Sequence, residues 1–319
     1  MATATASMRD NIDLTVLPFH KEALDSITQL RKDASTISLP DFTTATKTDT
    51  HTHPIPSWFR TLELSAAGRE TPTWDESSHL TFMAERGIKK SILSVSTPQA
   101  NAFASPNKFE PDAELRKKKT VALARLLNEY VAEVCRLWPE RFSWMGVTAL
   151  PYVAESVREV EYALGLAPLR SGLGEFYFET ARALSSLIAS SPPFNATLLK
   201  YPSLHWRISH GAGAFPDISE RFLLGFPDIS AAAQEAYKSR LWYDSAGPVW
   251  PNQIKGVLEG MGVGTKQCVF GTDYPYGIGF WDVDANIKGL VEAEFMGGEE
   301  KEGVYWRNAE RLWGGKIKF

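Results

Sequence analysis

Segments typical of buried strands alternate with segments typical of helices along most of the chain, and this alternation limits the fold more than any other feature. The strand patterns lie at residues 47–53, 89–96, 142–147, 204–210, 241–244 and 267–271. Helix patterns separate them, and the longest runs from about Pro111 to Trp138 with a continuous apolar stripe. Strands that alternate with helices in this way predict an α/β fold with parallel strands.

The part of the chain that precedes the first strand pattern has a different character. Residues 1–46 are polar and rich in Thr, Ala and Ser, with one helix pattern from about Pro18 to Arg31. We therefore expect an N-terminal extension over residues 1–46, partly helical or disordered, followed by a single domain over residues 47–319.

Composition excludes several classes of partner. The 319 residues carry a formal net charge of −4, which gives no basic surface for nucleic acid or for an anionic membrane. No run approaches the roughly 20 apolar residues of a membrane span, and the N-terminus lacks the apolar core of a signal peptide. The two cysteines, Cys135 and Cys268, make no disulfide framework. We expect a cytoplasmic protein that binds neither nucleic acid nor membrane.

Two histidines separated by one residue, His51 and His53, end the first strand pattern. Side chains two residues apart in a strand point to the same face, so both imidazoles should project together. Imidazole binds zinc and neighbouring transition metals, and a carboxylate commonly completes such a site. The pair therefore predicts metal ligands; the alternative is two solvated surface histidines beside Pro54.

Two further polar residues follow other strand patterns. His210 ends the fourth pattern, and Asp273 comes two residues after the sixth. Because the carboxyl ends of parallel strands meet at one edge in a barrel, both side chains should lie near His51 and His53. Taken alone, His210 reads equally well as a buried histidine bonded to a turn, and Asp273 as a helix N-cap. The convergence of four residues favours a metal site.

Four motifs follow one another along the chain. They are Thr48-Asp49-Thr50-His51-Thr52-His53, Ile208-Ser209-His210-Gly211-Ala212-Gly213, Trp242-Tyr243-Asp244-Ser245-Ala246 and Phe270-Gly271-Thr272-Asp273-Tyr274-Pro275. Together they resemble the amidohydrolase-related decarboxylases typified by aminocarboxymuconate semialdehyde decarboxylase, from about residue 47 to the end. Two further stretches, Trp74-Asp75-Glu76-Ser77 and Leu93-Ser94-Val95-Ser96-Thr97-Pro98, are most similar to fungal 6-methylsalicylate decarboxylases.

The resemblance implies a fold, a cofactor and a set of roles. The fold is a metal-dependent hydrolase-type (β/α)8 barrel, and the cofactor is one divalent metal, most often zinc, with manganese as the alternative. By position, His51, His53 and Asp273 match the metal ligands, and His210 matches a catalytic histidine beside the metal. Asp273 also matches a group that handles a proton, so the resemblance makes it catalytic as well. A homodimer is a further expectation from the family.

The chain departs from that family at one metal ligand. The family has a further metal-binding histidine on its fifth strand, in a Phe-Val-His-Pro-like sequence, and nothing here corresponds to it. The alternation of strands and helices also fails between about Leu164 and Phe176, where Pro168, Gly172 and Gly174 interrupt the pattern. Both observations are explained if the fourth strand, its helix and the fifth strand are missing. We therefore expect an incomplete barrel.

The remaining three histidines do not fill the vacant role. His20 lies in the extension, His79 lies in a helix pattern, and His205 is separated from His210 by an odd number of residues. An odd separation within a strand places two side chains on opposite faces.

These features predict a carboxy-lyase that decarboxylates a small aromatic carboxylate, 6-methylsalicylate or a related hydroxybenzoate, in fungal polyketide secondary metabolism. A second hypothesis within the same superfamily is a metal-dependent hydrolase, in which a metal-bound water attacks a lactone or ester. A third is a non-catalytic truncated form that associates with an intact homologue. Release of CO2, hydrolysis of lactones and metal content distinguish the three.

Overall fold

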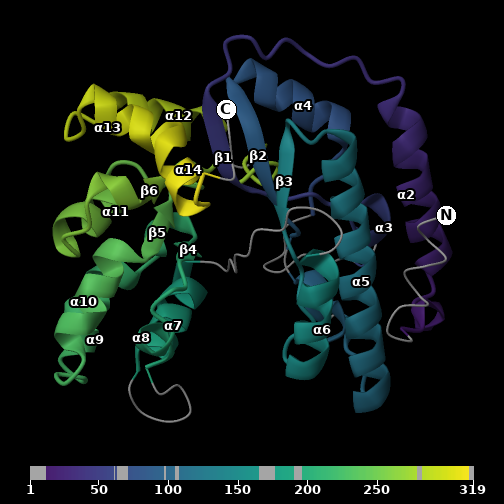
Figure 1. The fold of residues 1–319 in the computed structure, drawn as a ribbon, viewed down its shortest axis with the longest axis horizontal. Coiled ribbons are helices and arrows are strands. Elements are labelled where there is room, and N and C mark those ends of the chain that lie inside the picture. The colour runs from purple at the N-terminus through teal and green to yellow at the C-terminus, as the bar shows by residue number, and fades with distance from the viewer. Residues whose placement is uncertain are drawn as a thin grey trace. The chain divides into compact units, whose positions relative to one another are not determined.

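The computed structural model describes residues 12–60, 62, 71–96, 98–104, 108–164, 177–189, 196–278 and 282–315. The chain forms two compact units, one from residues 1–45 and 52–171 and the other from residues 46–51 and 172–319. Both units contain parallel strands with helices between them along the chain (Figure 1). The predicted α/β class is therefore confirmed within each unit.

The first unit is built around one long helix, α5. Its elements are α2 (His20–Ala34), α3 (Ser57–Arg60), α4 (Glu76–Glu85), β2 (Ile88–Ser94), α5 (Ala113–Leu137), β3 (Phe142–Met145) and α6 (Val153–Leu164). Asp112 caps α5, because its carboxylate accepts hydrogen bonds from Glu114 N and Leu115 N, each at 2.9 Å. Strands β2 and β3 pair in parallel, with Ser91 opposite Phe142, so α5 connects two neighbouring parallel strands.

Helix α2 confirms the helix pattern predicted from about Pro18 to Arg31. Its buried residues Ala23, Ile27 and Leu30 are spaced by four and three positions, so they share one face. The helix packs on α5. This largely polar part of the chain is therefore attached to the first unit through the apolar face of α2. The domain boundary expected at residue 46 stays a prediction.

A buried ion pair joins α5 to α6. Arg125 Nε donates to Glu159 Oε2 at 3.0 Å, and both side chains are almost completely buried. Asn128 Nδ2 donates to Glu159 Oε1 and to Val147 O, each at 2.9 Å, and Asn128 Oδ1 accepts from Val147 N at 2.7 Å. Because buried charges are stable only when they are paired and hydrogen-bonded, this network fixes α6 against α5 and the segment after β3.

The second unit contains the other parallel strands. Its elements are β1 (Lys47–Thr52) as far as His51, α7 (Tyr177–Ile188), α8 (Thr197–Lys200), β4 (Trp206–Ile208), α9 (Phe215–Leu223), α10 (Ser230–Ser239), β5 (Leu241–Asp244), α11 (Asn252–Lys255), β6 (Cys268–Val269), α12 (Val283–Glu292), α13 (Gly298–Glu302) and α14 (Asn308–Leu312). Strands β4, β5 and β6 are neighbours in that order. Strand β1 runs beside the segment that follows β6, where Thr50 N donates to Phe270 O at 2.9 Å.

The core of the second unit lies between its strands and α7 to α10. Phe215, Tyr237, Leu241 and Tyr243 are each at most 2% exposed and belong to one apolar cluster. The rings of Phe215 and Tyr237 meet edge to face with centroids 5.6 Å apart. This packing holds the strands whose carboxyl ends carry the polar residues described below.

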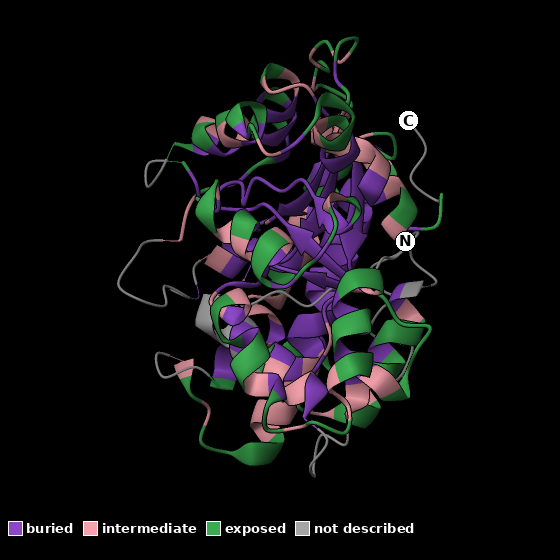
Figure 2. Ribbon diagram, turned by 90° about the vertical axis from the view of Figure 1, so that its left-hand side faces the viewer, coloured by how far each residue is buried: buried purple, intermediate pink, exposed green. Residues whose placement is uncertain are grey.

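The structure contains all six predicted strands, and their residues are largely buried (Figure 2). Helices α9 and α10 were not predicted. The sequence Phe-Pro-Asp-Ile-Ser begins α9 at residues 215–219 and leads into α10 at residues 226–230. Both helices are short, at nine and ten residues, and Gly and Pro residues flank them, which weakens the helical pattern. The interruption was predicted between about Leu164 and Phe176; α6 ends at Leu164, and residues 165–176 lie outside the described residues.

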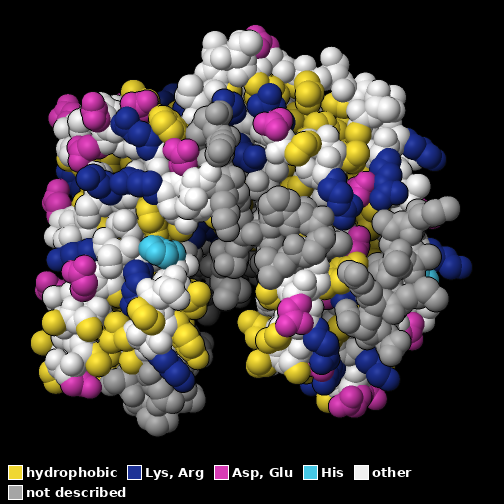
Figure 3. All heavy atoms as spheres, viewed as in Figure 1, with side chains coloured by type: hydrophobic (Ala, Val, Ile, Leu, Met, Phe, Trp, Pro, Cys, Tyr) yellow, Lys and Arg dark blue, Asp and Glu magenta, His cyan; other side chains and the backbone are white. Residues whose placement is uncertain are grey.

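The outer surface carries charges of both signs. On the face seen in Figure 3, Lys and Arg side chains are interspersed with Asp and Glu side chains. Among the residues that the structure describes, no helix combines the length and the apolar character needed to cross a bilayer.

The buried pair between α5 and α6 gives a first prediction. Glu159→Gln should lower the free energy of unfolding by about 3 to 5 kcal/mol, because Arg125 would stay charged in the interior without its anionic partner. Urea unfolding at pH 7 measures the change. The control is Glu85→Gln, whose side chain is 63% exposed beside Arg86 and whose replacement should change stability little. Equal losses in the two variants would contradict the assigned role of Glu159.

Candidate functional site

Polar side chains gather at the carboxyl ends of the strands in the second unit. His51 lies near the end of β1, Asp244 ends β5, His210 follows β4, and Asp273 follows β6. All four are buried, with exposures of 3%, 0%, 5% and 7% in that order. The structure thus brings together three of the residues singled out in the sequence, His51, His210 and Asp273, at the edge where a parallel α/β fold places its chemistry.

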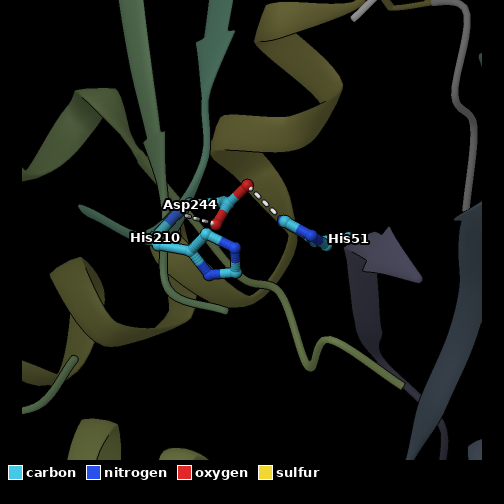
Figure 4. Close-up of side chains that lie close together, drawn as sticks. All are labelled: His51, His210 and Asp244. Atoms are coloured by element: carbon cyan, nitrogen blue, oxygen red, sulfur yellow. Dashed lines mark hydrogen bonds and ion pairs between the residues drawn. The ribbon is translucent and has the colours of Figure 1, made fainter. Parts of the chain in front are cut away.

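Asp244 lies between the two histidines (Figure 4). Its Oδ2 accepts a hydrogen bond from His51 Nδ1 at 2.9 Å and another from Arg207 Nη1. Its Oδ1 accepts from the backbone N–H groups of His210 at 2.8 Å and Ala246 at 3.1 Å. Four donors therefore converge on one buried carboxylate.

The ionised Asp244 determines which nitrogen of the His51 ring carries the proton. Burial opposes ionisation of Asp244, but the hydrogen bond from His51 and the positive charge of Arg207 outweigh it and hold the pKa of Asp244 well below its usual range. Burial lowers the pKa of His51 to about 4, so the ring is neutral at pH 7. Since a carboxylate only accepts hydrogen bonds, the proton of the neutral ring lies on Nδ1. The other nitrogen, Nε2, carries the lone pair and lies 3.4 Å from Asp273 Oδ1.

The ring of His210 has an equally defined orientation. Its Nδ1 lies 3.1 Å from Ala246 O, and because a carbonyl oxygen only accepts, the neutral ring carries its proton on Nδ1 and its lone pair on Nε2. The ring centroids of His51 and His210 are 4.8 Å apart. The backbone of His210 has a φ of 54°, a left-handed conformation that is uncommon for a residue with a side chain. Gln253 Nε2 holds it by donating to His210 O at 2.7 Å.

A second buried carboxylate, Asp49, connects the segments that carry His51 and Asp273. Its Oδ1 accepts from His51 N at 3.1 Å and from Thr272 N at 3.0 Å, and its Oδ2 accepts from the Thr272 hydroxyl. Burial raises the pKa of Asp49 to about 7, against the opposing effect of these hydrogen bonds. Asp273 N in turn donates to His51 O at 2.8 Å, so β1 and the segment after β6 are held in fixed register.

Two residues of this cluster have the spacing that metal ligands require. Ligand atoms that share a tetrahedral zinc ion, with bonds of about 2.0 to 2.1 Å, lie about 3.4 Å from each other. His51 Nε2 and Asp273 Oδ1 are 3.4 Å apart. A metal-binding histidine commonly donates its other N–H to a carboxylate, and Asp244 accepts that bond from His51. A second set of donor atoms, from His51, His210 and Asp244, lies within 4.8 Å of one another.

His53 belongs to the first unit. Its Nδ1 lies 2.9 Å from Ser94 O, so the neutral ring carries its proton on Nδ1 and its lone pair on Nε2. An unprotonated Nε2 is free to bind a metal. The role of His53 as a metal ligand together with His51 stays a prediction.

The other three histidines have local partners. His20 Nδ1 lies 2.8 Å from Leu17 O, and the Nδ1 atoms of His79 and His205 each accept from a tryptophan Nε1 at 3.1 Å. His79 is buried and His205 is exposed. The hydrogen-bond partner of each is a tryptophan outside the cluster.

Asp244 and Arg207 received no role from the sequence. Asp244 ends β5, just as His210 comes two residues after β4 and Asp273 four residues after β6, and that position was the available signal. Arg207 lies in β4 with a 4% exposed fraction, and a fully buried arginine without a charged partner is rare. The partner could not be named from the sequence, because the contact depends on which strands are neighbours.

A close approach at Gly271 gives a second prediction. A Cβ at this position would lie 2.9 Å from His51 Cβ and 3.3 Å from Ala246 Cβ. Gly271→Ala should therefore displace His51 and weaken Mn²⁺ binding about tenfold or more, as losses next to metal ligands usually do. Titration with Mn²⁺ followed by electron paramagnetic resonance measures the affinity. Gly264→Ala is the control, since its Cβ would meet nothing within 4 Å; unchanged affinity in Gly271→Ala would refute the crowding argument.

Sequence comparison identifies relatives for part of the chain. Residues 180–315 match the Amidohydrolase family. A 2-amino-3-carboxymuconate-6-semialdehyde decarboxylase of Caenorhabditis elegans is 28% identical over 141 residues, which make up 42% of this chain and 32% of that protein. The chain thus spans about a third of the length of this curated relative.

Structural comparison extends the likeness over most of the chain. A solved amidohydrolase II has a TM-score of 0.67 at 19% identity and covers 84% of this chain and 99% of its own. The 2,6-dihydroxybenzoate decarboxylase from Rhizobium has a TM-score of 0.59 at 16% identity, with coverages of 85% and 99%. The 5-carboxyvanillate decarboxylase from Novosphingobium aromaticivorans, solved with manganese and a hydroxylated nitrobenzoic acid, has a TM-score of 0.59 at 15% identity, with coverages of 87% and 98%.

These likenesses confirm the predicted fold class and the resemblance on which it rested. At such identities the solved structures establish the fold alone, and the sequence match covers the part of the chain that supplies His210, Asp244 and Asp273. The chain has the fold of solved amidohydrolases, and its residues 180–315 match the Amidohydrolase family.

Proposed function

We propose that this protein is a metal-dependent, non-oxidative decarboxylase of a hydroxybenzoate. The observation that carries the proposal is the buried cluster in which His51 Nε2 lies 3.4 Å from Asp273 Oδ1 with the His210 ring beside His51. The cluster contains two metal-ligand types and a third group that can move a proton. The curated relative supports the reaction class, because it is named a decarboxylase of a carboxymuconate semialdehyde.

His51, His53 and Asp273 are the proposed metal ligands. Three protein ligands leave coordination positions for a substrate, as in catalytic rather than structural metal sites. The family has a further metal-binding histidine on the fifth strand of its barrel, which this sequence lacks. The three proposed ligands do not depend on that histidine, since they come from β1, the residues after it and the segment after β6. Zinc is the first choice for two imidazoles and a carboxylate, and manganese is the alternative because the 5-carboxyvanillate decarboxylase was solved with it.

A divalent cation bound by these residues would act as a Lewis acid toward the substrate carboxylate and a neighbouring oxygen. The chain itself supplies the orientation of its ligands and the proton. Asp244 keeps the lone pair of His51 on Nε2, and Asp49 holds the backbone of His51 and Thr272, so neither ligand needs to reorganise when the site is filled.

His210 is the proposed proton donor. Its Nδ1 is held by Ala246 O, so Nε2 is the nitrogen that gains and loses a proton during turnover. Protonated Nε2 gives its proton to the ring carbon that bears the carboxylate. The bond between that carbon and the carboxylate carbon then breaks, CO2 leaves, and the electron pair of the broken bond restores the aromatic ring. Asp273 is the alternative proton carrier.

The finer assignments rest on sequence motifs and chemistry. The substrate that we propose is 6-methylsalicylate or a related hydroxybenzoate, which places the protein in fungal polyketide metabolism. The likeness in fold to decarboxylases of 2,6-dihydroxybenzoate and 5-carboxyvanillate supports a small aromatic carboxylate. We also propose a cytoplasmic homodimer; Cys135 and Cys268 are both buried thiols, which suits a reducing compartment.

A third prediction tests the reaction and the role of His210 together. The purified chain with added Zn²⁺ or Mn²⁺ should release CO2 from 6-methylsalicylate. His210→Ala should lower the rate by about 10² to 10⁴-fold, the usual contribution of a general acid, while metal content stays unchanged. His205→Ala is the matched control, because this exposed histidine lies five residues away and outside the cluster. Loss of metal in His210→Ala would show that this residue is a ligand instead.

Metal content separates the proposal from its alternatives. The wild-type chain should hold close to one equivalent of metal by elemental analysis, and removal by a chelator should abolish CO2 release until metal is restored. Hydrolysis of a lactone panel without CO2 release would favour the hydrolase. Less than about a tenth of an equivalent of metal, with no activity after metal is added, would favour a non-catalytic truncated form.

A further inference from the structure

We propose that Arg207 and Asp244 form a positioning pair that determines which nitrogen of His51 faces the metal site and holds the backbone that presents His210. This inference rests on the proposed function, because the metal site belongs to that proposal. Neither the sequence motifs nor the comparisons assign a role to Arg207 or Asp244. Neither residue is a proposed ligand, and neither is a proposed proton donor.

Both members of the pair are buried. Asp244 is 0% exposed and Arg207 is 4% exposed. An ionised carboxylate in such a place needs a cation and hydrogen-bond donors in fixed positions. The guanidinium of Arg207 bonds Asp244 Oδ2, and it reaches this carboxylate because β4 and β5 are neighbouring parallel strands. Arg207 therefore keeps Asp244 available as an acceptor.

The pair also determines the position of the proton on His51. Arg207 Nη1 lies 3.1 Å from His51 Nδ1, and both atoms lie against Asp244 Oδ2. Since the guanidinium has only donors, it cannot accept a hydrogen bond from His51 and leaves Asp244 as the acceptor. Because the carboxylate oxygen faces Nδ1 at 2.9 Å and would repel a lone pair there, the arrangement favours the neutral tautomer with the proton on Nδ1. The lone pair on Nε2 then lies on the side of Asp273.

Asp244 also holds the backbone of His210. The left-handed backbone at this residue, with φ of 54°, is unfavourable for a residue with a Cβ unless neighbouring groups hold it. Asp244 Oδ1 accepts from His210 N at 2.8 Å, and Ala246, whose carbonyl accepts from His210 Nδ1, is itself bonded to the same Oδ1 at 3.1 Å. One carboxylate thus positions the backbone of His210 and the loop that orients its ring.

Asp244→Asn changes this arrangement in a defined way. The asparagine side chain is nearly the same size but carries one acceptor and one N–H2 donor. With its oxygen toward the two backbone N–H groups, it would direct an N–H group at His51 Nδ1. The favoured tautomer of His51 would then carry its proton on Nε2, the nitrogen that must be unprotonated to bind a metal.

The test measures the histidine tautomers and the affinity for Mn²⁺ in the full chain. Two-dimensional ¹H–¹⁵N spectra of the metal-free protein at pH 8 resolve six imidazoles, and His51→Gln identifies the signal of interest. Wild type should show His51 protonated on Nδ1, and Asp244→Asn should show it protonated on Nε2. Mn²⁺ affinity in Asp244→Asn should fall about 10- to 100-fold.

Three further variants keep the result falsifiable if Asp244→Asn folds poorly. Asp244→Glu retains a carboxylate and should keep the Nδ1 proton while losing part of the Mn²⁺ affinity. Arg207→Gln should also keep the Nδ1 proton and lower the Mn²⁺ affinity. Glu159→Gln removes the anion of the other buried arginine pair, in the first unit, and should change neither readout although it lowers stability.

The outcomes separate this inference from the proposed function. If the tautomer and affinity change as stated but wild type releases no CO2, the pair is confirmed and the decarboxylase is wrong. If wild type decarboxylates while Asp244→Asn keeps the wild-type tautomer and affinity, the pair is wrong and the decarboxylase stands. If Arg207→Gln binds Mn²⁺ with the affinity of the wild type, Arg207 has no positioning role.

Discussion

The arrangement of the site depends on the ionised carboxylate of Asp244. It has no exposed surface and accepts hydrogen bonds from a guanidinium, an imidazole and two backbone N–H groups. A buried charge is stable only while such partners are present. The partners come from β1, from β4 and the turn after it, and from the residues that follow β5. Stability of this one group therefore requires that several separate segments be correctly placed at the same time.

The strands could be predicted because a strand that is buried on both faces has a recognisable sequence pattern. Parallel strands covered on both sides read as nearly continuous apolar runs, and the runs at 91–95 and 268–270 coincide with parts of β2 and β6. Helices α9 and α10 could not be predicted in the same way. They owe their stability to the cluster formed with Phe215 and Tyr237, which is a property of the folded unit and not of either segment.

The site was predicted in part for a related reason. His51, His210 and Asp273 come at the ends of strands, and the topology of a parallel fold places such residues together. Asp244 and Arg207 were missed because their meeting depends on the order β4-β5-β6 and on the side chain's direction at Arg207. The strand-end position of Asp244 and the charge of Arg207 inside a strand were the signals in the sequence. The role of His53 stays a prediction that rests on its spacing from His51.

The hydrogen bonds between Asp49 and Thr272 join residues that are 223 positions apart. Contacts of such long range close a long loop before they are rewarded, and a high share of them slows folding. During synthesis, Asp49 leaves the ribosome long before Thr272 exists, so the strand that carries His51 must wait for nearly the whole chain before its carboxylate finds its partners. The proposed metal site therefore cannot form early in synthesis, because its two proposed ligands His51 and Asp273 lie beside residues that meet only after most of the chain has been made.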